Sequence, residues 1–210
     1  MKAWILRSLR KGIVTTKFPS GENETVSPWS TIPIHKGGDK NPYCPSGAIK
    51  DGIVIHGSCI SCGMCSPSFE PSMDVHSSQN RKVIRELERS IKIYAMDSGS
   101  CGACNLEIMA LSSPQYDGTR LGITFTNTPR QADALMISGI LTEGMKDAVL
   151  RAFESMAEPR VVFATGTCAI SGGILGKSVS TALNTDVIVP GCPPDPFVII
   201  NAIQKLRGMP

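Results

Sequence analysis

Short apolar runs alternate with amphipathic stretches over the second half of the chain. Residues 143–157 carry apolar side chains at helical spacing, from Met145 to Met156, behind a Thr142 cap. Runs with the length of buried strands lie at 92–95, 122–126, 134–138, 161–164 and 186–189. Strands and helices in alternation indicate a parallel sheet that is covered on both faces. The pattern therefore predicts an α/β domain with a doubly wound parallel sheet.

The chain before residue 81 lacks this alternation. Residues 1–43 hold seven Lys and Arg against three Asp and Glu, and prolines interrupt them. They predict a short basic amphipathic start followed by an extended arm. Residues 66–80 contain five Ser and two Pro without periodicity, which is typical of a linker.

A helix is expected directly after this linker, with Asn80 as its cap. Its apolar face would consist of Val83, Ile84, Leu87 and Ile91. The whole chain is then expected to have three regions. These are a basic N-terminal arm at 1–43, a small cysteine-bearing domain with its linker at 44–80, and the α/β domain at 81–210.

The charge balance and the length of the apolar runs exclude some classes of function. The 210 residues carry 21 Lys and Arg against 18 Asp and Glu, so a net charge of +3 gives little attraction for a polyanion. No apolar run approaches the roughly 20 residues that span a bilayer. The start of the chain lacks the small-residue cleavage site of a secretory signal. We expect no nucleic acid partner, no transmembrane segment and no export.

Eight cysteines dominate the candidate chemistry. They form an early group and a late group: Cys44, Cys59, Cys62 and Cys65, then Cys101, Cys104, Cys168 and Cys192. Such spacings in a cytosolic chain indicate metal ligation before disulfides. Each late cysteine or pair follows a predicted strand, and the carboxyl ends of parallel strands are where open α/β sheets bind ligands. Flanking glycines and prolines permit close backbone approach and amide hydrogen bonds to sulfur, so the late group fits a 4Fe–4S cluster.

Other interpretations of the late group stay open. Cys101-x-x-Cys104 alone also fits a thioredoxin-like redox pair or half of a zinc site. Glu107 is expected on the first turn of the following helix. There it either stabilises the helix through the helix dipole, or lies behind the cysteine ligands and transfers protons at a subunit interface. Asp133 and Asp195 are expected to cap helices or close turns.

The early group forms half of a ferredoxin pattern. Bacterial ferredoxins repeat C-x2-C-x2-C-x3-C-P, and the last cysteine of each run ligates the cluster of the other run. Cys44-Pro45 matches the end of one run, and the remaining three cysteines match the start of the next. Together they complete one 4Fe–4S cluster. A zinc ribbon is the alternative, which the overlapping Cys-x-x-Cys triplet disfavours, and His56 is expected on a surface strand rather than as a ligand.

Several motifs resemble one family of redox subunits. They are Cys101-Gly-Ala-Cys104-Asn-Leu-Glu107, Thr128-Pro-Arg-Gln-Ala-Asp133, Gly166-Thr-Cys168-Ala, Gly172-Gly173 and Pro190-Gly-Cys192-Pro-Pro194. Over roughly residues 90–207 the chain resembles the small subunit of complex-I-related, formate-hydrogenlyase-like (group 4) membrane-bound NiFe hydrogenases and the 20 kDa (B) subunit of NADH-quinone oxidoreductase. The first Cys-x-x-Cys is the hydrogenase-like form, since quinone-reducing members carry adjacent cysteines there.

The resemblance implies a flavodoxin-like fold and a 4Fe–4S cluster on Cys101, Cys104, Cys168 and Cys192. The first 20 residues are similar to the start of ferredoxin-like subunits that accompany these hydrogenases, so the chain resembles a fusion of two neighbouring subunits. The implied function is that of an electron-transfer subunit of an oxidoreductase complex, with no catalytic residue in this chain.

The implied partners follow from the same resemblance. Two 4Fe–4S clusters would relay electrons between a ferredoxin or another iron–sulfur subunit and a NiFe large subunit or a complex I 49 kDa-like subunit. The alternatives are a nickel-free complex-I-like enzyme that reduces a quinone or a sulfur-type acceptor, and a zinc-binding structural module. The expected location is peripheral, on membrane subunits at the cytoplasmic side of the cell membrane, with the basic start docked on a partner.

Overall fold

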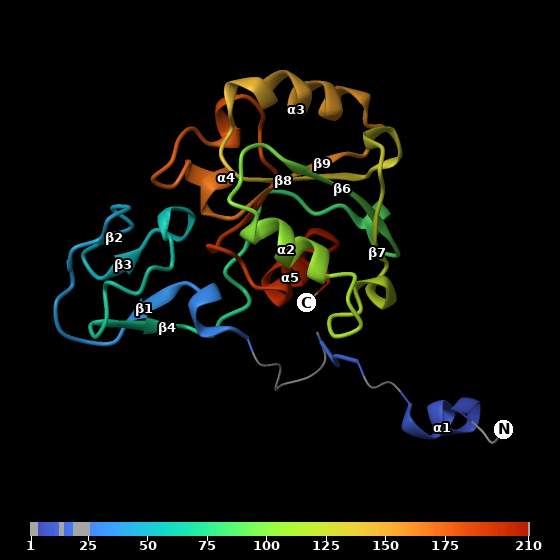
Figure 1. Ribbon diagram of the computed structural model, residues 1–210, viewed down its shortest axis with the longest axis horizontal. Coiled ribbons are helices and arrows are strands. Elements are labelled where there is room, and N and C mark those ends of the chain that lie inside the picture. Colours follow the sequence, from blue (N-terminus) through green and yellow to red (C-terminus); the bar gives the residue numbers. More distant parts are fainter. Residues whose placement is uncertain (1–3, 13–14, 19–25, 210) are drawn as a thin grey trace.

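A six-stranded sheet forms the centre of the structure, a computed structural model that describes residues 4–12, 15–18 and 26–209. Its strand order is β5-β10-β9-β8-β6-β7 (Figure 1). The strands are β5 (Gln79–Asn80), β6 (Ile91–Asp97), β7 (Ile123–Phe125), β8 (Ala134–Ser138), β9 (Val161–Thr165) and β10 (Val187–Val189). All pairs are parallel except that of β5 with β10. Without β5, the order is that of flavodoxin-like sheets, which confirms the predicted fold class.

Helices cover both faces of this sheet (Figure 1). On one face, α3 (Glu143–Ser155) buries Val149 and Ala152 against apolar side chains of β8 and β9. On the other face lie α2 (Ala103–Ala110) and α5 (Pro196–Leu206). Every residue of α5 except Lys205 is buried. The remaining helical elements of this domain are α4 (Thr167–Ser171), η3 (Arg85–Leu87), η4 (Gly118–Leu121), η5 (Pro129–Gln131) and η6 (Val179–Thr181).

The helix expected after Asn80 does not form, and that prediction is wrong. Asn80 instead ends β5, where it pairs with Val187 of β10. Its side chain donates to the carbonyl of Ala202 in α5, 3.0 Å away. Ile84 is buried beside α5, and its amide donates to the carbonyl of Leu206. Contacts with the sheet and with α5 therefore override the local helical spacing.

A small lobe, residues 32–71, lies beside the main sheet (Figure 1). It contains β1 (Pro33–His35), β2 (Ile49–Lys50), β3 (Ile53–Val54), η2 (His56–Ser58) and β4 (Phe69–Pro71). β1 pairs antiparallel with β4, and β2 with β3. Its core consists of Ile32, Ala48, Val54, Cys59 and Phe69. The linker-like stretch 66–80 thus carries β4 in the small lobe and β5 in the main sheet.

The N-terminal arm is attached to the main domain through a short segment. Two carbonyls of this segment, those of Thr16 and Phe18, accept hydrogen bonds from the Arg120 guanidinium, each at 3.0 Å. The Phe18 ring is 6% exposed and lies 5.0 Å from the Phe197 ring. Nearer the start, the predicted amphipathic stretch forms α1 (Trp4–Lys11), and η1 (Pro28–Ser30) follows the arm. Of the arm expected at 1–43, residues 1–3, 13–14 and 19–25 lie outside the described residues, and its end, from residue 32, belongs to the small lobe described above.

α1 stands apart from the rest of the chain (Figure 1). Its apolar side chains Trp4, Leu6 and Leu9 are all more than half exposed. Within the described parts of the chain, no helix has the length and apolar character that a bilayer crossing requires.

Candidate functional site

The four late cysteines meet at one edge of the main sheet. Cys101 lies in the loop after β6 and Cys192 in the loop after β10. Cys104 and Cys168 lie on the first turns of α2 and α4, rather than in loops as expected. Because β6, β9 and β10 run parallel, the segments that follow them share the carboxyl edge of the sheet. We call these four residues the edge set.

The thiols of the edge set influence one another. Burial raises the pKa of the Cys104 thiol to about 12, with Cys192, Cys168 and Cys101 as further causes. Burial also raises the pKa of Cys192, again with contributions from Cys168 and Cys101. Buried thiolates that repel each other are stabilised by a bound cationic centre, which removes their protons and offsets their charge.

Glycine at position 166 makes room for the edge set. A Cβ atom at Gly166 would lie 2.5 Å from the Cys104 sulfur, and the φ angle of this residue is +85°. Any side chain would therefore collide with the thiol and strain the backbone. The amide of Gly166 donates to the carbonyl of Val189 at 2.8 Å, which holds the β9 and β10 loops together.

Asp97 orders the loop that carries Cys101. One carboxylate oxygen accepts hydrogen bonds from the amides of Gly99 and Ser100, at 2.8 and 2.7 Å. The other oxygen accepts from the Ser100 hydroxyl and from the Asn105 side chain. Burial alone would raise the pKa of Asp97, but these hydrogen bonds outweigh it and hold the pKa below its usual value. Asp97 was not among the expected site residues, although Asp followed by Ser-Gly-Ser is a turn signal in the sequence.

The four early cysteines surround one cavity in the small lobe. Cys44, Cys59, Cys62 and Cys65 all line it, beside apolar residues that include Ala48, Ile49 and Val54. We call these four cysteines the lobe set. Burial works to raise the pKa of Cys44, but hydrogen bonds from Ser46, Ala48 and Gly47 lower it below the usual value.

The other perturbed thiols of the lobe set shift upward. Burial raises the pKa of Cys59, and Cys65 and Cys44 add to the shift. Burial also raises the pKa of Cys65, with Cys62 and Cys44 as additional causes. The four early cysteines therefore form one electrostatically connected group, as do the four late ones.

The two sets lie next to each other. The hydroxyl of Thr167, directly before Cys168, donates to the carbonyl of Cys59 at 2.5 Å. Cys59 and Cys62 also contribute to the raised pKa of Cys192. The small lobe thus approaches the edge of the main sheet that carries the late cysteines.

The residues of this sheet edge lie within the part of the chain that matches a known sequence family. Residues 101–206 match the model of the family described as NADH ubiquinone oxidoreductase, 20 Kd subunit. The chain belongs to this family. The match contains the whole edge set, whereas the lobe set lies before it.

Two curated relatives and one solved structure are similar to this 20 kDa-subunit family member. Formate hydrogenlyase subunit 7 of Escherichia coli (strain K12) is 35% identical over 139 residues, which is 63% of this chain and 54% of that relative. The probable membrane-bound hydrogenase subunit mbhJ of Pyrococcus furiosus is 35% identical over 131 residues, 58% of this chain and 78% of that protein. A chain from the membrane-bound sulfane sulfur reductase, an archaeal respiratory membrane complex, is 29% identical with a TM-score of 0.52, covering 59% of this chain and 71% of that one.

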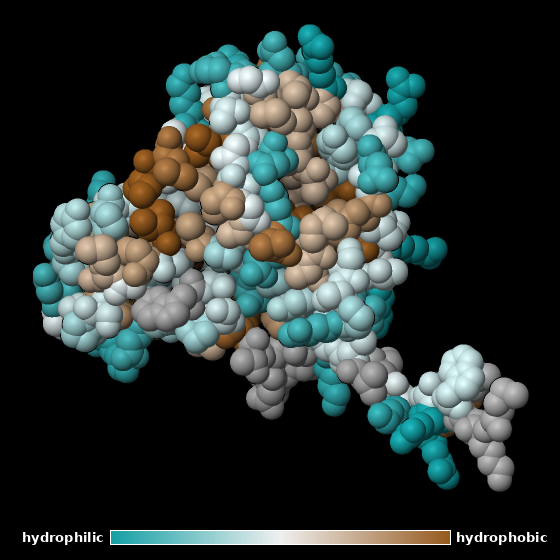
Figure 2. All heavy atoms as spheres, in the orientation of Figure 1, coloured by the Kyte–Doolittle hydropathy of each residue, from teal (hydrophilic) through white to brown (hydrophobic). Residues whose placement is uncertain are grey.

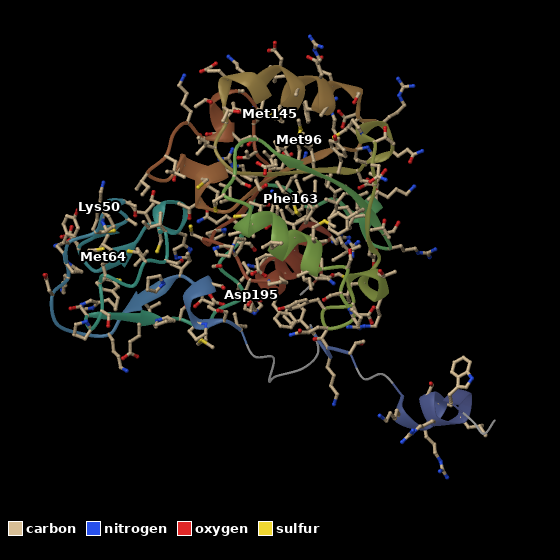
Figure 3. All side chains as sticks on the ribbon, viewed as in Figure 1. Lys50, Met64, Met96, Met145, Phe163 and Asp195 are labelled. Carbon is tan, nitrogen blue, oxygen red and sulfur yellow. The ribbon has the colours of Figure 1, made fainter. Side chains whose placement is uncertain are left out.

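The other residues singled out in this family member have mainly structural surroundings. Asp195 caps α5 as expected and accepts hydrogen bonds from the amides of Phe197 and Ser27, at 2.9 and 3.1 Å (Figure 3). Asp133 accepts from the amide of Lys92 at 2.8 Å. His56 begins η2 rather than lying on a strand, so its expected position is wrong.

Glu107 lies on the second turn of α2, one turn later than expected. The α2 helix starts at Ala103 because the left-handed Gly102 serves as its cap, which places the acid beyond the first turn. Burial raises the pKa of the Glu107 carboxyl, and the charge of Asp195 raises it further. Glu107 therefore does not stabilise the N-terminus of the helix directly.

The chemistry of the donor atoms fits iron–sulfur clusters. Among the residues described, no three His, Cys, Asp or Glu side chains converge on the position of a single metal ion. Each set instead offers four thiols, and four cysteine thiolates are the usual ligands of a 4Fe–4S cluster. The collision that a Cβ at Gly166 would cause shows a backbone shaped around sulfur.

Proposed function

We propose that this chain is the electron-transfer subunit of a membrane-associated hydrogenase complex. It would hold two 4Fe–4S clusters between a ferredoxin-type donor and a NiFe large subunit. The observation that carries the proposal is the hydrogen bond from Thr167, the residue before Cys168 of the edge set, to the carbonyl of Cys59 in the lobe set, in a chain whose family consists of oxidoreductase subunits.

The residues of the chain would bind and shield the two clusters. Cys44, Cys59, Cys62 and Cys65 would hold one cluster inside the apolar cavity of the small lobe. Cys101, Cys104, Cys168 and Cys192 would hold the other at the sheet edge. When bound, such clusters supply one-electron transfer at a potential that hydrogen bonds and solvent exposure adjust. Substrate conversion would belong to a partner subunit.

An apolar surface beside the edge set supports a large-subunit partner. On α2, Leu106 is 73% exposed and Met109 59% exposed, and on the loop after α4, Ile174 and Leu175 are 61% and 62% exposed. Figure 2 shows apolar side chains gathered over this side of the molecule. Exposed apolar patches of this kind are typical of protein interfaces. We propose that this surface faces the large subunit, at the cytoplasmic side of the membrane.

A sulfur-reducing complex is the second candidate. The solved chain described above, 29% identical to this one, belongs to a sulfane sulfur reductase rather than to a hydrogenase. A relay of the same construction would then end at a nickel-free large subunit with a sulfur-type acceptor. A quinone acceptor is the related possibility for a complex-I-like enzyme.

Metal analysis of the native complex tests these proposals. The two clusters of this chain would contribute about eight iron atoms and about eight acid-labile sulfides to a brown complex. Nickel in the same complex, together with hydrogen evolution from reduced ferredoxin, supports the hydrogenase. Iron and sulfide without nickel, with reduction of a sulfur compound, supports the second candidate. A colourless protein that contains zinc would contradict both.

A further inference from the structure

Thr167 contacts the backbone of both cysteine sets. It is 1% exposed and begins α4 directly before Cys168. Its amide donates to the carbonyl of Gly191, next to Cys192, at 3.0 Å. Its hydroxyl lies 2.5 Å from the carbonyl of Cys59 and 3.3 Å from the carbonyl of Gly191. One buried residue thus touches the segments that carry three of the eight thiols.

The hydroxyl is committed to the small lobe. A hydroxyl has one proton to donate, and the shorter of its two contacts is the one to Cys59. Gly191 keeps its hydrogen bond from the Thr167 amide in either case. Loss of the hydroxyl would therefore leave the Cys59 carbonyl without this donor in a buried place, where an unpaired polar group is costly.

Beside this hydrogen bond, η2 of the small lobe packs closely against α4. A Cβ atom at Gly57 in η2 would lie 2.6 Å from a methyl carbon of Ile170 in α4. Only the missing side chain lets η2 approach α4 to this distance. The hydrogen bond and the glycine contact together fix the position of the small lobe relative to the sheet edge.

We propose that Thr167 is a positioning residue whose hydroxyl clamps the lobe set to the edge set and thereby sets the coupling between them. A continuous path runs from the Cys59 thiol along its own backbone to the carbonyl, across one hydrogen bond to Thr167, and through one peptide bond to Cys168. This inference rests on the proposed function, since coupling has a redox meaning only when both sets hold clusters. It adds a specific residue that governs how the two sets communicate.

Substitution of Thr167 in the full chain within its native complex tests the proposal. Thr167→Val keeps the shape but removes the hydroxyl, and Thr167→Ser keeps the hydroxyl. Ser171→Ala is the matched control, because the Ser171 hydroxyl on the same helix donates to the Thr167 carbonyl within α4 and not to the small lobe. The readouts are iron and sulfide content, the spin–spin interaction between the two reduced clusters in electron paramagnetic resonance, and donor-driven turnover.

Thr167→Val should retain both clusters but weaken their spin–spin splitting. Turnover with the donor should fall, because a loosened small lobe would increase the average separation between the two sets. Thr167→Ser and Ser171→Ala should keep the splitting and the rate of the original chain. Unchanged splitting in Thr167→Val, with both clusters present, would overturn the proposal and leave the proposed function intact.

A second variant covers the case in which Thr167→Val does not load its clusters. Gly57→Ala leaves Thr167 unchanged but should push η2 away from α4, because its Cβ would collide with Ile170. Adding Ile170→Ala to Gly57→Ala should remove this collision and restore the original packing. Backbone hydrogen exchange at residues 56–66 reports the clamp without any cluster, and should be faster in Thr167→Val than in Ser171→Ala. Equal exchange in these two chains would refute the clamp. An original chain with fewer than two clusters would instead contradict the proposed function.

Discussion

Cys104 shows how strongly its surroundings act on a single thiol. Burial together with three neighbouring cysteines raises its pKa to about 12, so the free thiol holds its proton at any physiological pH. Cys44 in the small lobe shifts in the opposite direction, because hydrogen bonds to its sulfur outweigh its burial. Metal binding displaces thiol protons. If each set binds a cluster, removing the thiol proton would therefore cost more free energy at Cys104 than at Cys44.

Replacement of Cys44 tests how the eight cysteines are divided. Its sulfur accepts a hydrogen bond from the Ala48 amide at 3.3 Å and lines the cavity of the small lobe. Cys44→Ala should change or remove one cluster signal in electron paramagnetic resonance and leave the other unaltered. The control is Ser46→Ala, which removes a hydroxyl near the same sulfur and keeps the ligand. A disturbed signal from the cluster near Cys168 would show that this division is wrong.

At the scale of elements, the segment 15–18 acts as a strap over α5. The Phe18 ring lies among the buried side chains that cover α5, and Arg120 donates to the carbonyls of Thr16 and of Phe18 itself. Asp195, the cap of α5, accepts from the amide of Ser27 farther along the arm. This attachment adds to the burial of α5, which also packs against β5, β10 and α2.

Phe18→Ala should therefore destabilise the main domain. Loss of a buried phenylalanine side chain costs about 3 kcal/mol, because apolar contacts vanish and a cavity remains. Chemical denaturation of the full chain should show a lower midpoint, with an unchanged slope. Arg151→Ala serves as the comparison, since Arg151 is exposed on α3, which covers the opposite face of the sheet from the strap. An unchanged midpoint in Phe18→Ala would mean that the strap adds nothing to stability.

The elements also show how far local sequence patterns reach. The apolar run 134–138 coincides with β8, because a strand buried on both faces needs a continuous apolar sequence. The helical spacing at 83–91 failed because Ile84 and Ile91 find partners on α5 and in the sheet, which no local pattern contains. Cysteine spacing brought out both candidate sets. Thr167 and Asp97 were not predicted. The Thr167 hydroxyl bonds to the backbone of Cys59, which is distant in the sequence, and the Asp97 carboxylate bonds to amides of its own loop, whose conformation no local pattern gives.

At the scale of the whole molecule, the lobe set and the edge set lie side by side, one in the small lobe and the other at the edge of the main sheet. The lobe set surrounds a cavity whose other lining residues include Tyr43 and Met64, 74% and 57% exposed. Met64 lies in the small lobe in Figure 3, away from the main sheet. The edge set lies beside the exposed apolar residues of α2 and of the loop after α4. The donor would thus approach the lobe and the large subunit the sheet edge.

Cys192→Ala tests this order in the assembled complex. The substitution removes one thiol from the edge set, so it would change the proposed cluster there or prevent its formation. Turnover with the natural donor should be lost, while hydrogen–deuterium exchange at the NiFe centre of the partner should persist in part. Ser171→Ala, on α4 near the same edge, should retain most of the turnover, because its hydroxyl donates within α4. Normal donor-driven turnover without this cluster would disprove both the ligand assignment and the order.

The short connection between the small lobe and the main sheet has a further consequence. Residues 72–78 link β4 to β5, and Lys205 holds the connection by donating to the carbonyl of His76 at 2.6 Å. A short tether gives its two ends a local concentration in the millimolar range. Even a weak contact between them then stays formed, whereas two separate proteins would part on dilution. Each copy of the sheet domain is therefore synthesised with one small lobe. The one-to-one ratio of the two parts is set by translation of a single chain and not by the association of two proteins.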